Sequence, residues 1–396
     1  MRVSLSLLGA AAFMVIADAR VIDPLLRIIA DEYQASVGST AIIVTAYTVP
    51  YGLFQLVYGP LGDRIGKIKV MTAAMVLFAL GTAACAFAPS FPMLIVLRFL
   101  TGTAAAGLIP LSLAYIGDNF PYEERQTAIG GYLSAIMLGQ LLSSSLGGIF
   151  GEYLSWRSIF LLFGVVSLGI SVALWRASRL VPDEGRVRGR MSLAEAFKPY
   201  FQLMTKPTVR LIIVAVFIEG FFFSGGFAYI GAFLRDRYRL SYVAIGFMLG
   251  SFGLGGLIYS RSVSWLVHRF GEKGLITLGG WLTCACYLSM ALFQSWILFI
   301  PLNILLGLGF YMLHSTLQTK ATEMFPEARG TAVALFAFGL FMGQGIGAAA
   351  LGLIVDGPGY APAFAISGIA ILLLAFWLVN QMQRISLGSH NSSDGA

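Results

Sequence analysis

Long apolar stretches separated by short polar loops run through the whole chain. A helix that crosses the hydrocarbon core of a bilayer needs about 20 apolar residues, and twelve such stretches can be read from the sequence. Their approximate ranges are 4–30, 38–58, 69–88, 92–117, 127–150, 157–178, 210–234, 241–263, 274–294, 296–321, 331–355 and 361–382. This pattern predicts an all-α membrane protein with twelve transmembrane helices.

Composition and charge agree with a membrane protein. Hydrophobic residues make up 58% of the chain and charged residues 11%, and the mean hydropathy is +0.81, which excludes an ordinary soluble domain. Lysine and arginine concentrate in alternate loops. The positive-inside rule places those loops and both termini in the cytoplasm, so we expect a multi-pass protein of the cytoplasmic (inner) membrane. Loops that face anionic lipid explain the net charge of +7, and no nucleic acid partner is expected.

The second half of the sequence faintly repeats the first at a distance of 205 residues, which becomes 204 after Phe120-Pro121. The matched pairs include Asp31 with Asp236, Gly66 with Gly271, Gly102 with Gly307, Arg125 with Arg329 and Gly148 with Gly352. Parallel repeats with a binding site between them are a transporter architecture.

The repeat also predicts how the chain is divided. Residues 1–178 and 210–382 should form two six-helix bundles, joined by a cytoplasmic linker at 179–209 and followed by a flexible cytoplasmic tail at 383–396. Within the linker, Ser192 and Glu195 have the spacing of a capping box. This spacing predicts a short helix at the membrane interface, with an unstructured loop as the alternative.

The polar loop between the second and third stretches carries the most specific motif. Residues 59–69 read Gly-Pro-Leu-Gly-Asp-Arg-Ile-Gly-Lys-Ile-Lys, and a reduced copy stands at 264–273, between the eighth and ninth stretches. Glycines permit the tight turn, and the basic residues hold the loop in the cytoplasm. The loop resembles the signature loop of the major facilitator superfamily. Two further segments, 98–102 and 118–125, are similar to the family's helix 4 motif and to its connection between helices 4 and 5.

The resemblance covers essentially the whole chain and is closest to the twelve-helix drug:proton antiporters. It implies two pseudo-symmetric six-helix bundles that rock about a central site, driven by a proton gradient and without a cofactor. In that family the loop aspartate lies near the start of helix 11 and latches the halves in one conformation. The residues that the resemblance assigns to this latch are Gly59, Asp63, Arg64, Gly66 and Arg125.

Helix 5 departs from the antiporter pattern. Those antiporters carry G-x-x-x-G-P-x-x-G-G, whereas residues 139–148 keep the outer glycines and place Ser143-Ser144 at the inner Gly-Pro. Small residues still allow close helix packing, but the kink that proline would supply is absent.

Ionisable residues inside the predicted helices point to the mechanism, because a charge near the bilayer centre is costly unless it is paired or faces water. Asp18 and Glu219 are the deepest carboxylates. At 100° per residue, Arg20 and Asp23 share a face of helix 1 from which Asp18 points away. We expect Asp23 to pair with Arg98, either as a switch or as a static pair, with Asp18 or the substrate itself as the alternative partner. The candidates for proton coupling are Asp18, Glu219, Asp23 and Arg98.

Polar and aromatic residues at mid-depth are candidates for a substrate cavity. Gln140 and Gln344 are equivalent in the repeat, and a buried amide must find a partner, either a substrate or a neighbouring helix. Aromatic rings can wall an adaptable apolar pocket, although packing is the alternative for each. The expected cavity residues are Arg20, Gln140, Gln344, Tyr47, Tyr51, Tyr132, Phe222, Tyr229, Tyr311 and Phe338.

These features predict a secondary active transporter, working by proton-coupled efflux of amphipathic or drug-like small molecules. The alternatives within transport are a lipid or glycolipid flippase and a sugar exporter, and from another class a membrane sensor that does not transport. No catalytic, metal-ligand or nucleotide-binding spacing is present in the sequence, so neither an enzyme nor a metal site is expected. The expected partners are the substrate, protons and membrane lipids, and the expected state is a monomer.

Overall fold

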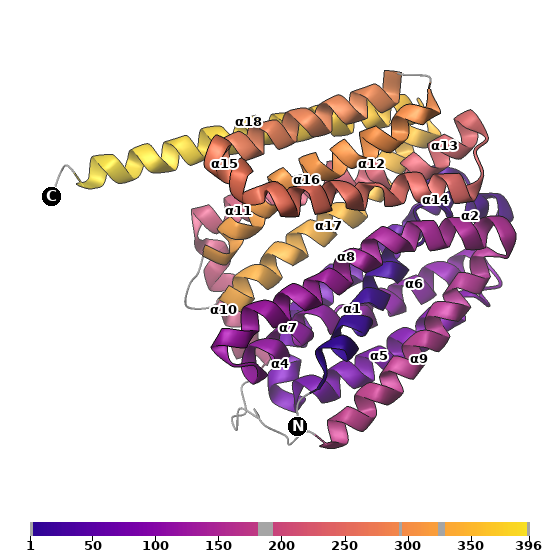
Figure 1. Ribbon diagram of the computed structural model, residues 1–396, viewed down its shortest axis with the longest axis horizontal. Coiled ribbons are helices and arrows are strands. Elements are labelled where there is room, and N and C mark those ends of the chain that lie inside the picture. Colours follow the sequence, from indigo (N-terminus) through magenta and orange to yellow (C-terminus); the bar gives the residue numbers. More distant parts are fainter. Residues whose placement is uncertain (1–2, 181–192, 293–294, 324–328, 394–396) are drawn as a thin grey trace.

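The computed structural model of the protein describes residues 3–180, 193–292, 295–323 and 329–393. Within these ranges the chain is helical apart from short turns, and no strand occurs. Figure 1 shows two helical bundles, one coloured indigo to magenta from the first half of the chain and one coloured red to yellow from the second. The predicted all-α membrane fold is confirmed.

The amino-terminal bundle contains the first six predicted crossings. Its helices are α1 (Leu5–Arg20), α2 (Leu26–Glu32), α3 (Val37–Thr40), α4 (Ile42–Ile65), α5 (Lys67–Cys85), α6 (Phe91–Ala105), α7 (Leu108–Asn119), α8 (Tyr122–Tyr153) and α9 (Trp156–Leu180). Ser4, Ser36 and Ser90 each accept a hydrogen bond from the backbone N–H three residues later. These serines cap the N-termini of α1, α3 and α6 and so fix where these helices begin.

The linker and the carboxyl-terminal bundle follow. Their helices are α10 (Leu193–Thr205), α11 (Pro207–Glu219), the π-helix η1 (Gly220–Ser224), α12 (Gly225–Phe227), α13 (Ile230–Tyr238), α14 (Tyr242–Gly250), α15 (Phe252–Leu292), the 3₁₀-helix η2 (Trp296–Leu298), α16 (Phe299–Glu323), α17 (Arg329–Asp356) and α18 (Tyr360–Ser393). α10 lies where the interfacial helix was expected, whereas its predicted cap, Ser192, lies outside the described residues.

The described helices account for twelve crossings. Ten segments are long and apolar enough to cross a membrane, and one of them, Tyr242–Leu292, has 51 residues. At 1.5 Å per residue this segment would reach roughly 75 Å if it were straight, more than twice the roughly 30 Å hydrocarbon core. It reverses at Gly271, whose φ of 62° and ψ of 178° are not helical. α1 and α2 supply the remaining crossing.

Helix 1 is interrupted near Pro24. α1 ends at Arg20 and α2 begins at Leu26, with turns between them. The backbone N–H of Asp23 bonds to the carbonyl of Arg20, three residues earlier, and Pro24 has no N–H to continue the helical ladder. The interruption decides which way Asp23 faces.

The internal repeat is visible in backbone and packing. Gly66, with φ of 108°, and its counterpart Gly271 both have positive φ, which glycine adopts without strain. Gly102 is packed so closely that a Cβ atom there would meet the backbone of Tyr47. Its counterpart Gly307 is packed in the same way against Phe252, 205 residues after Tyr47. The two bundles therefore share their helix packing.

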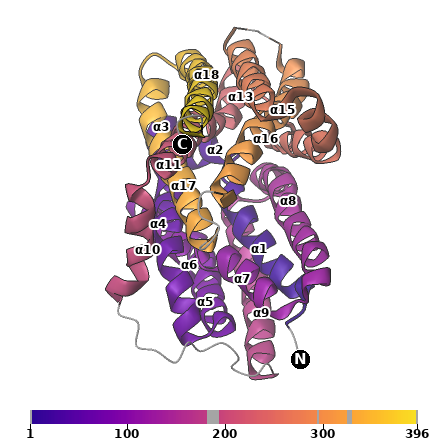
Figure 2. The ribbon, with the colours of Figure 1, turned by 90° about the vertical axis from the view of Figure 1, so that its left-hand side faces the viewer.

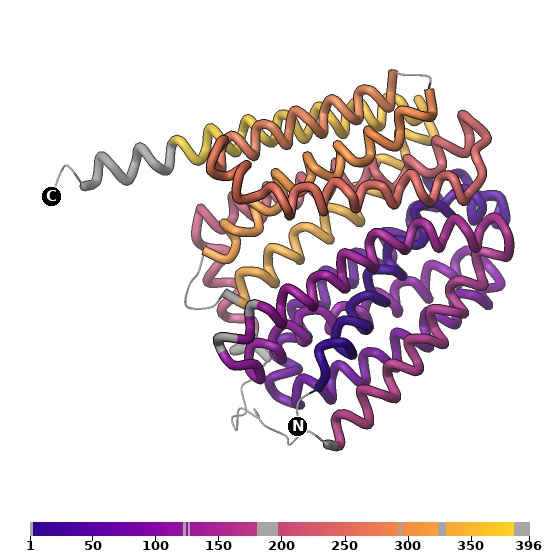
Figure 3. The backbone as a smooth tube through the Cα atoms, viewed as in Figure 1, coloured from indigo at the N-terminus to yellow at the C-terminus, as the bar shows by residue number. Residues whose placement is uncertain are grey.

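Both termini lie at the same end of the bundles (Figures 1 and 3), and Figure 2 views the molecule from that end. We call this end the terminal face and the other end the distal face. α18 continues to Ser393, so residues 383–393 are helical where a flexible tail was expected.

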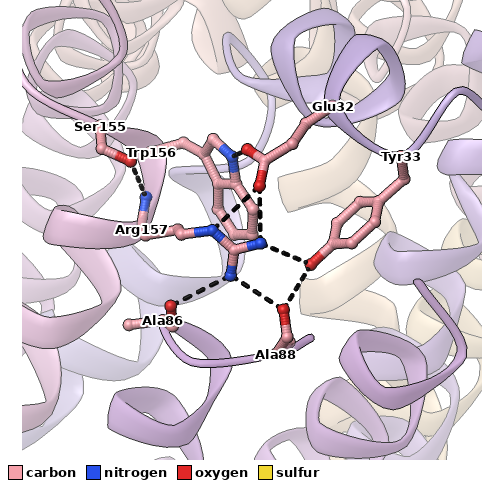
Figure 4. Close-up of polar contacts among 7 residues, drawn as sticks. All are labelled: Glu32, Tyr33, Ala86, Ala88, Ser155, Trp156 and Arg157. Carbon is pink, nitrogen blue, oxygen red and sulfur yellow. Dashed lines mark hydrogen bonds and ion pairs between the residues drawn. The ribbon is translucent and has the colours of Figure 1, made fainter. Parts of the chain in front are cut away.

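A polar clamp fixes the distal end of the first bundle (Figure 4). The Arg157 guanidinium donates to Glu32 at 2.6 and 3.0 Å, to Tyr33 Oη at 3.0 Å, and to the carbonyls of Ala86 and Ala88 at 3.1 and 3.0 Å. The indole of the neighbouring Trp156 also donates to Glu32. The clamp ties α2, the turn after α5 and the start of α9 together.

Candidate transport site

The deepest charges of the amino-terminal bundle form a sealed ion pair. Arg98 Nη1 on α6 lies 2.6 Å from Asp18 Oδ2 on α1, and both side chains are 0% exposed. The guanidinium carbon lies 4.3 Å from the ring centroid of Tyr47, which adds a cation–π contact. Asp18 Oδ1 and Arg98 Nε are buried without a hydrogen-bond partner. The pair is charge-balanced but incompletely hydrogen-bonded.

The expected pairing of Arg98 with Asp23 is wrong in this structure, and the alternative partner Asp18 takes its place. The expectation treated helix 1 as continuous, which put Asp23 at the depth of Arg98. In the structure, turns over residues 21–25 separate Asp23 from the end of α1. Asp23 instead lies 3.7 Å from Arg20 Nη1, with its Oδ2 atom buried and not hydrogen-bonded.

Arg20 and Asp23 line a narrow polar crevice between the two bundles. The other lining residues are Gln140, Ser144, Phe223, Phe227, Leu249 and Phe252. The Arg20 guanidinium lies 5.9 Å from the ring centroid of Phe227. The predicted separation of Asp18 from the face that holds Arg20 and Asp23 therefore holds: one face is sealed inside a bundle, and the other meets the opposite bundle.

A larger apolar pocket adjoins the crevice at Gln140. It has a volume of about 240 Å³ and is lined by Ser134, Met137, Leu138, Gln140, Leu141, Gly253, Gly256, Leu257 and Tyr311. These residues come from α8 of one bundle and from α15 and α16 of the other. Across the pocket, Tyr311 Oη donates a hydrogen bond of 3.2 Å to Gln140 Oε1. Arg20, Gln140 and Tyr311 are the expected cavity residues that line these two spaces.

The carboxyl-terminal bundle has its own buried carboxylate. Glu219, 1% exposed on α11, places Oε2 3.0 Å from Nδ1 of His314 on α16. Glu219 Oε1 is buried without a hydrogen-bond partner. His314 is not among the site residues predicted from the sequence. The criterion that selected Glu219, an ionisable group inside a membrane-spanning stretch, also applies to His314.

The other expected cavity residues lie in packed positions. Tyr47, Tyr132 and Tyr229 are fully or almost fully buried, and each donates its hydroxyl hydrogen to a carbonyl of its own bundle, on Val15, Ile109 and Ala348 respectively. Tyr51 packs across the bundle interface, 4.5 Å from Phe341 between ring centroids.

The remaining three cavity candidates lie on or beside the packed surfaces of α11, η1 and α17. The Phe222 ring is tilted against that of Phe221, with the ring centroids 4.8 Å apart. Gln344 is buried, and its backbone packs closely against Gly220. A Cβ atom added at Gly220 would lie 3.0 Å from the backbone N of Gln344. Phe338 is partly buried, and its carbonyl lies 3.4 Å from where a Cβ of Gly52 would stand.

Two repeat-related carboxylates join the bundles at the distal face. Glu152, at the end of α8, accepts a 2.6 Å hydrogen bond from the backbone N–H of Tyr242, at the start of α14. Asp356, at the end of α17, accepts one of 2.8 Å from Gly38 N–H at the start of α3, and one of 2.5 Å from Ser36. Glu152 and Asp356 are 204 residues apart, as the repeat requires. A carboxylate at a helix N-terminus is favourable, so we call this pair the distal caps.

A third polar link stands beside the caps. Arg27 of the first bundle lies 2.9 Å from Asp31 and 3.3 Å from Asp236 of the second. Tyr360 donates to the same Asp236 at 2.6 Å. The distal end of the interface is therefore closed by polar contacts between the bundles.

On the terminal face the ion pairs of Lys67 and Lys320 each stay inside one bundle. Lys67 lies 3.0 Å from Asp63 and 2.6 Å from Asp118. In the second bundle, Lys320 lies 2.8 Å from Glu272. The expected latch residue Asp63 thus closes its own loop in this conformation.

The other expected latch residues lie in or near the same loop. Gly66 has the positive φ that the turn needs, and a Cβ at Gly59 would meet open space. Arg64 is exposed. Arg125 donates to the carbonyl of Phe120 at 3.3 Å, so it holds the start of α8 against the preceding turn.

Comparison with known proteins gives one consistent result. A profile of the Major Facilitator Superfamily matches residues 8–328 and 262–389. The chain is 26% identical over 351 residues to the uncharacterized MFS-type transporter YceJ of Bacillus subtilis, with 86% of each chain covered. It is 25% identical over 358 residues to a probable sugar efflux transporter of Helicobacter pylori, with 89% of this chain and 88% of the relative covered.

A solved structure shows the same fold. A bacterial homologue of the human lysosomal transporter Spinster, in an inward-facing and unoccupied conformation, matches with a TM-score of 0.71 at 18% identity, over 95% of this chain and 94% of that chain.

Proposed function

The chain belongs to the Major Facilitator Superfamily, and we propose that this transporter exports amphipathic, drug-like small molecules across the cytoplasmic membrane in exchange for protons. The observation that carries the proposal is the pair of adjoining spaces between the bundles. The apolar pocket suits the hydrophobic part of a substrate, and the crevice with Arg20 and Asp23 suits a polar end. Gln140 lines both spaces and joins them into one site.

Few polar side chains line the larger space, which favours an amphipathic substrate over a strongly hydrophilic one. Among its lining residues only Ser134, Gln140 and Tyr311 have polar side chains, and two of these bond to each other. A polyhydroxylated ligand that enters an apolar pocket leaves hydroxyl groups unpaired, at a cost of about 1–3 kcal/mol for each.

The conformation is consistent with alternating access. With both termini in the cytoplasm, as the distribution of basic residues predicts, the distal caps and the Arg27–Asp236 link close the outer side. We propose that this is the inward-facing state and that export requires these contacts to break. A monomer suffices for this cycle, because each cap joins the two halves of one chain.

Sugar efflux is the second candidate function. Its support is the probable sugar efflux transporter of Helicobacter pylori, which matches along most of both chains. Under this alternative, arabinose would move through the protein and ethidium would not.

The test is transport by purified protein in liposomes with an imposed pH gradient. Ethidium, arabinose and a fluorescent lysophospholipid represent the drug, sugar and lipid classes, and liposomes without protein are the control. We expect gradient-driven ethidium accumulation that a protonophore abolishes. Movement of arabinose alone would contradict the proposal and indicate a sugar exporter. Movement of the lysophospholipid alone would contradict it and indicate a flippase. Binding without any flux would indicate a sensor.

A further inference from the structure

We propose that Glu219 and His314 form the proton-binding site that couples transport to the pH gradient, and that Asp18 and Arg98 do not carry the proton. This inference rests on the proposed function, because it assigns a place to the proton that export requires. Four observations support it: the composition of each pair, the exposure of the histidine, the helix geometry at Glu219 and the connection of α16 to the substrate pocket.

The two buried pairs differ in whether their net charge can change. Arginine stays protonated at all relevant pH values, so removing the charge of Asp18 would leave a bare guanidinium in a site that is 0% exposed. Imidazole in its unperturbed state gains and loses a proton between about pH 5 and pH 8. With one shared proton, Glu219 and His314 carry no net charge, which suits burial. Without that proton the pair carries one negative charge, which requires water.

The exposure of the second pair fits proton exchange. His314 is 12% exposed, whereas Glu219 is 1% exposed, so the imidazole is the more accessible member of the pair. One face of the His314 ring stacks on Phe310, with centroids 4.8 Å apart, and Phe336 lies 5.5 Å away. These rings restrict the directions from which water can reach the pair.

No other described charge neutralises this pair. Among the side chains that the structure describes, Glu219 and His314 form an ion pair with each other and with no third residue. The other titratable or charged side chains described on the packed elements α10, α11, η1, α14, α15, α16, α17 and α18 are Lys198, Tyr200, Arg210, Tyr242, Tyr259, Arg261, His268, Arg269, Glu272, Lys273, Cys284, Cys286, Tyr287, Tyr311, Lys320, Glu323, Asp356 and Tyr360. Of these, Tyr311 bonds to Gln140, Lys320 to Glu272 and Tyr360 to Asp236.

The backbone beside Glu219 departs from a regular α-helix. The π-helix η1 begins directly after it, at Gly220, and π-turns inside helices occur frequently at functional sites. Gly220 lies against α17 so closely that a Cβ there would meet the carbonyl of Leu340. The same α17 ends in the distal cap Asp356, so Glu219 adjoins an element that must move during the cycle.

One helix connects the proton site to the substrate pocket. α16 holds His314, and three residues earlier it holds Tyr311, which lines the apolar pocket and bonds to Gln140 of the other bundle. A substrate that takes the place of this hydrogen bond would contact the helix that carries the proton-binding histidine. Substrate and proton therefore act on α16 from adjacent positions.

The first experiment measures the proton directly and needs no substrate. Infrared spectra of the purified protein in lipid nanodiscs, recorded between about pH 5 and pH 8, report protonated carboxyl groups. We expect a titrating carboxyl band that disappears in Glu219→Gln and changes its midpoint in His314→Asn. The matched control is Glu323→Gln, the same substitution on a side chain that is 63% exposed at the end of α16. An identical titrating band in Glu219→Gln would overturn the proposal.

The second experiment separates coupling from transport. We expect Glu219→Gln to keep ethidium exchange across liposomes without a gradient and to lose accumulation driven by the pH gradient, whereas Glu323→Gln should keep both. Full gradient-driven accumulation in Glu219→Gln would overturn the inference while leaving the proposed function intact. Failure of the wild type to move ethidium would count against the proposed function instead, and the infrared titration would still decide whether the pair binds a proton.

Discussion

The amino-terminal bundle holds its buried carboxylate against an arginine, whereas the carboxyl-terminal bundle holds its own against a histidine. Asp18 and Arg98 are both 0% exposed, and neither can give up its charge without leaving the other unbalanced. Glu219 and His314 lie 3.0 Å apart, and the histidine is 12% exposed. One bundle therefore pairs its carboxylate with a permanently charged guanidinium, and the other pairs its carboxylate with an imidazole.

The two bundles differ at these buried charges although the repeat places the same kind of contact elsewhere in both. The position of Arg98 corresponds to Asn303, which is also fully buried but bonds to the carbonyl of Phe299 on its own helix at 2.8 Å. At the distal face, by contrast, both bundles keep a carboxylate cap. The repeat thus preserved the contacts that close the interface, while the buried charges diverged.

The largest effect is expected from breaking the fixed pair. Asp18→Ala or Arg98→Ala leaves one charge buried and unpaired, which should lower the free energy of unfolding by about 3–5 kcal/mol. Removing both charges should be far milder. Thermal unfolding of the purified single and double variants measures this, and losses that simply add in the double variant would mean that the two residues do not act as a pair.

The distal caps should give the next largest effect. Because both carboxylates are exposed, each cap contributes about 0.5–1 kcal/mol. The double variant Glu152→Gln/Asp356→Asn should therefore shift the conformational equilibrium toward opening of the distal face by about 1–2 kcal/mol, which is roughly five- to thirtyfold. Labelling of cysteines introduced near Gly38 measures the opening. An unchanged labelling rate would show that the caps do not close the interface.

Glu219→Gln should destabilise the fold only slightly, by about 1 kcal/mol, because a glutamine oxygen can still accept a hydrogen bond from His314. The same thermal unfolding measurement as for Asp18→Ala makes the contrast between the bundles quantitative. A loss as large as that of Asp18→Ala would show that the second pair is also a fixed structural pair.

The smallest effect is expected from Asp63→Asn. Asp63 is 54% exposed and pairs with Lys67 within its own loop, and exposed pairs contribute about 0–1 kcal/mol. Thermal unfolding should change little, whereas accessibility of the distal face should fall if Asp63 stabilises the opposite conformation. Unchanged accessibility together with unchanged transport would make the motif a loop anchor alone.

The sequence predicted those features that depend on local pattern. Apolar length marked the twelve crossings, and the repeat anticipated the paired turns at Gly66 and Gly271. The partner of Arg98 was not predicted correctly, because this contact joins α6 to α1, and periodicity along one helix does not determine which residue of another helix it meets. The contact between Glu219 and His314 joins residues 95 apart in sequence, and helical periodicity carries no information about such a contact.

Titration of His314 tests the central contrast most directly. The chain has three histidines, so the protein can be labelled with isotope-enriched histidine and each signal assigned by single substitutions, with His268 and His390 as internal references. The account predicts that the nuclear magnetic resonance signal of His314 changes with pH, and that its midpoint moves in Glu219→Gln while those of the other two histidines stay fixed. A His314 signal that does not change between about pH 5 and pH 8, or a midpoint unaffected by Glu219→Gln, would contradict it.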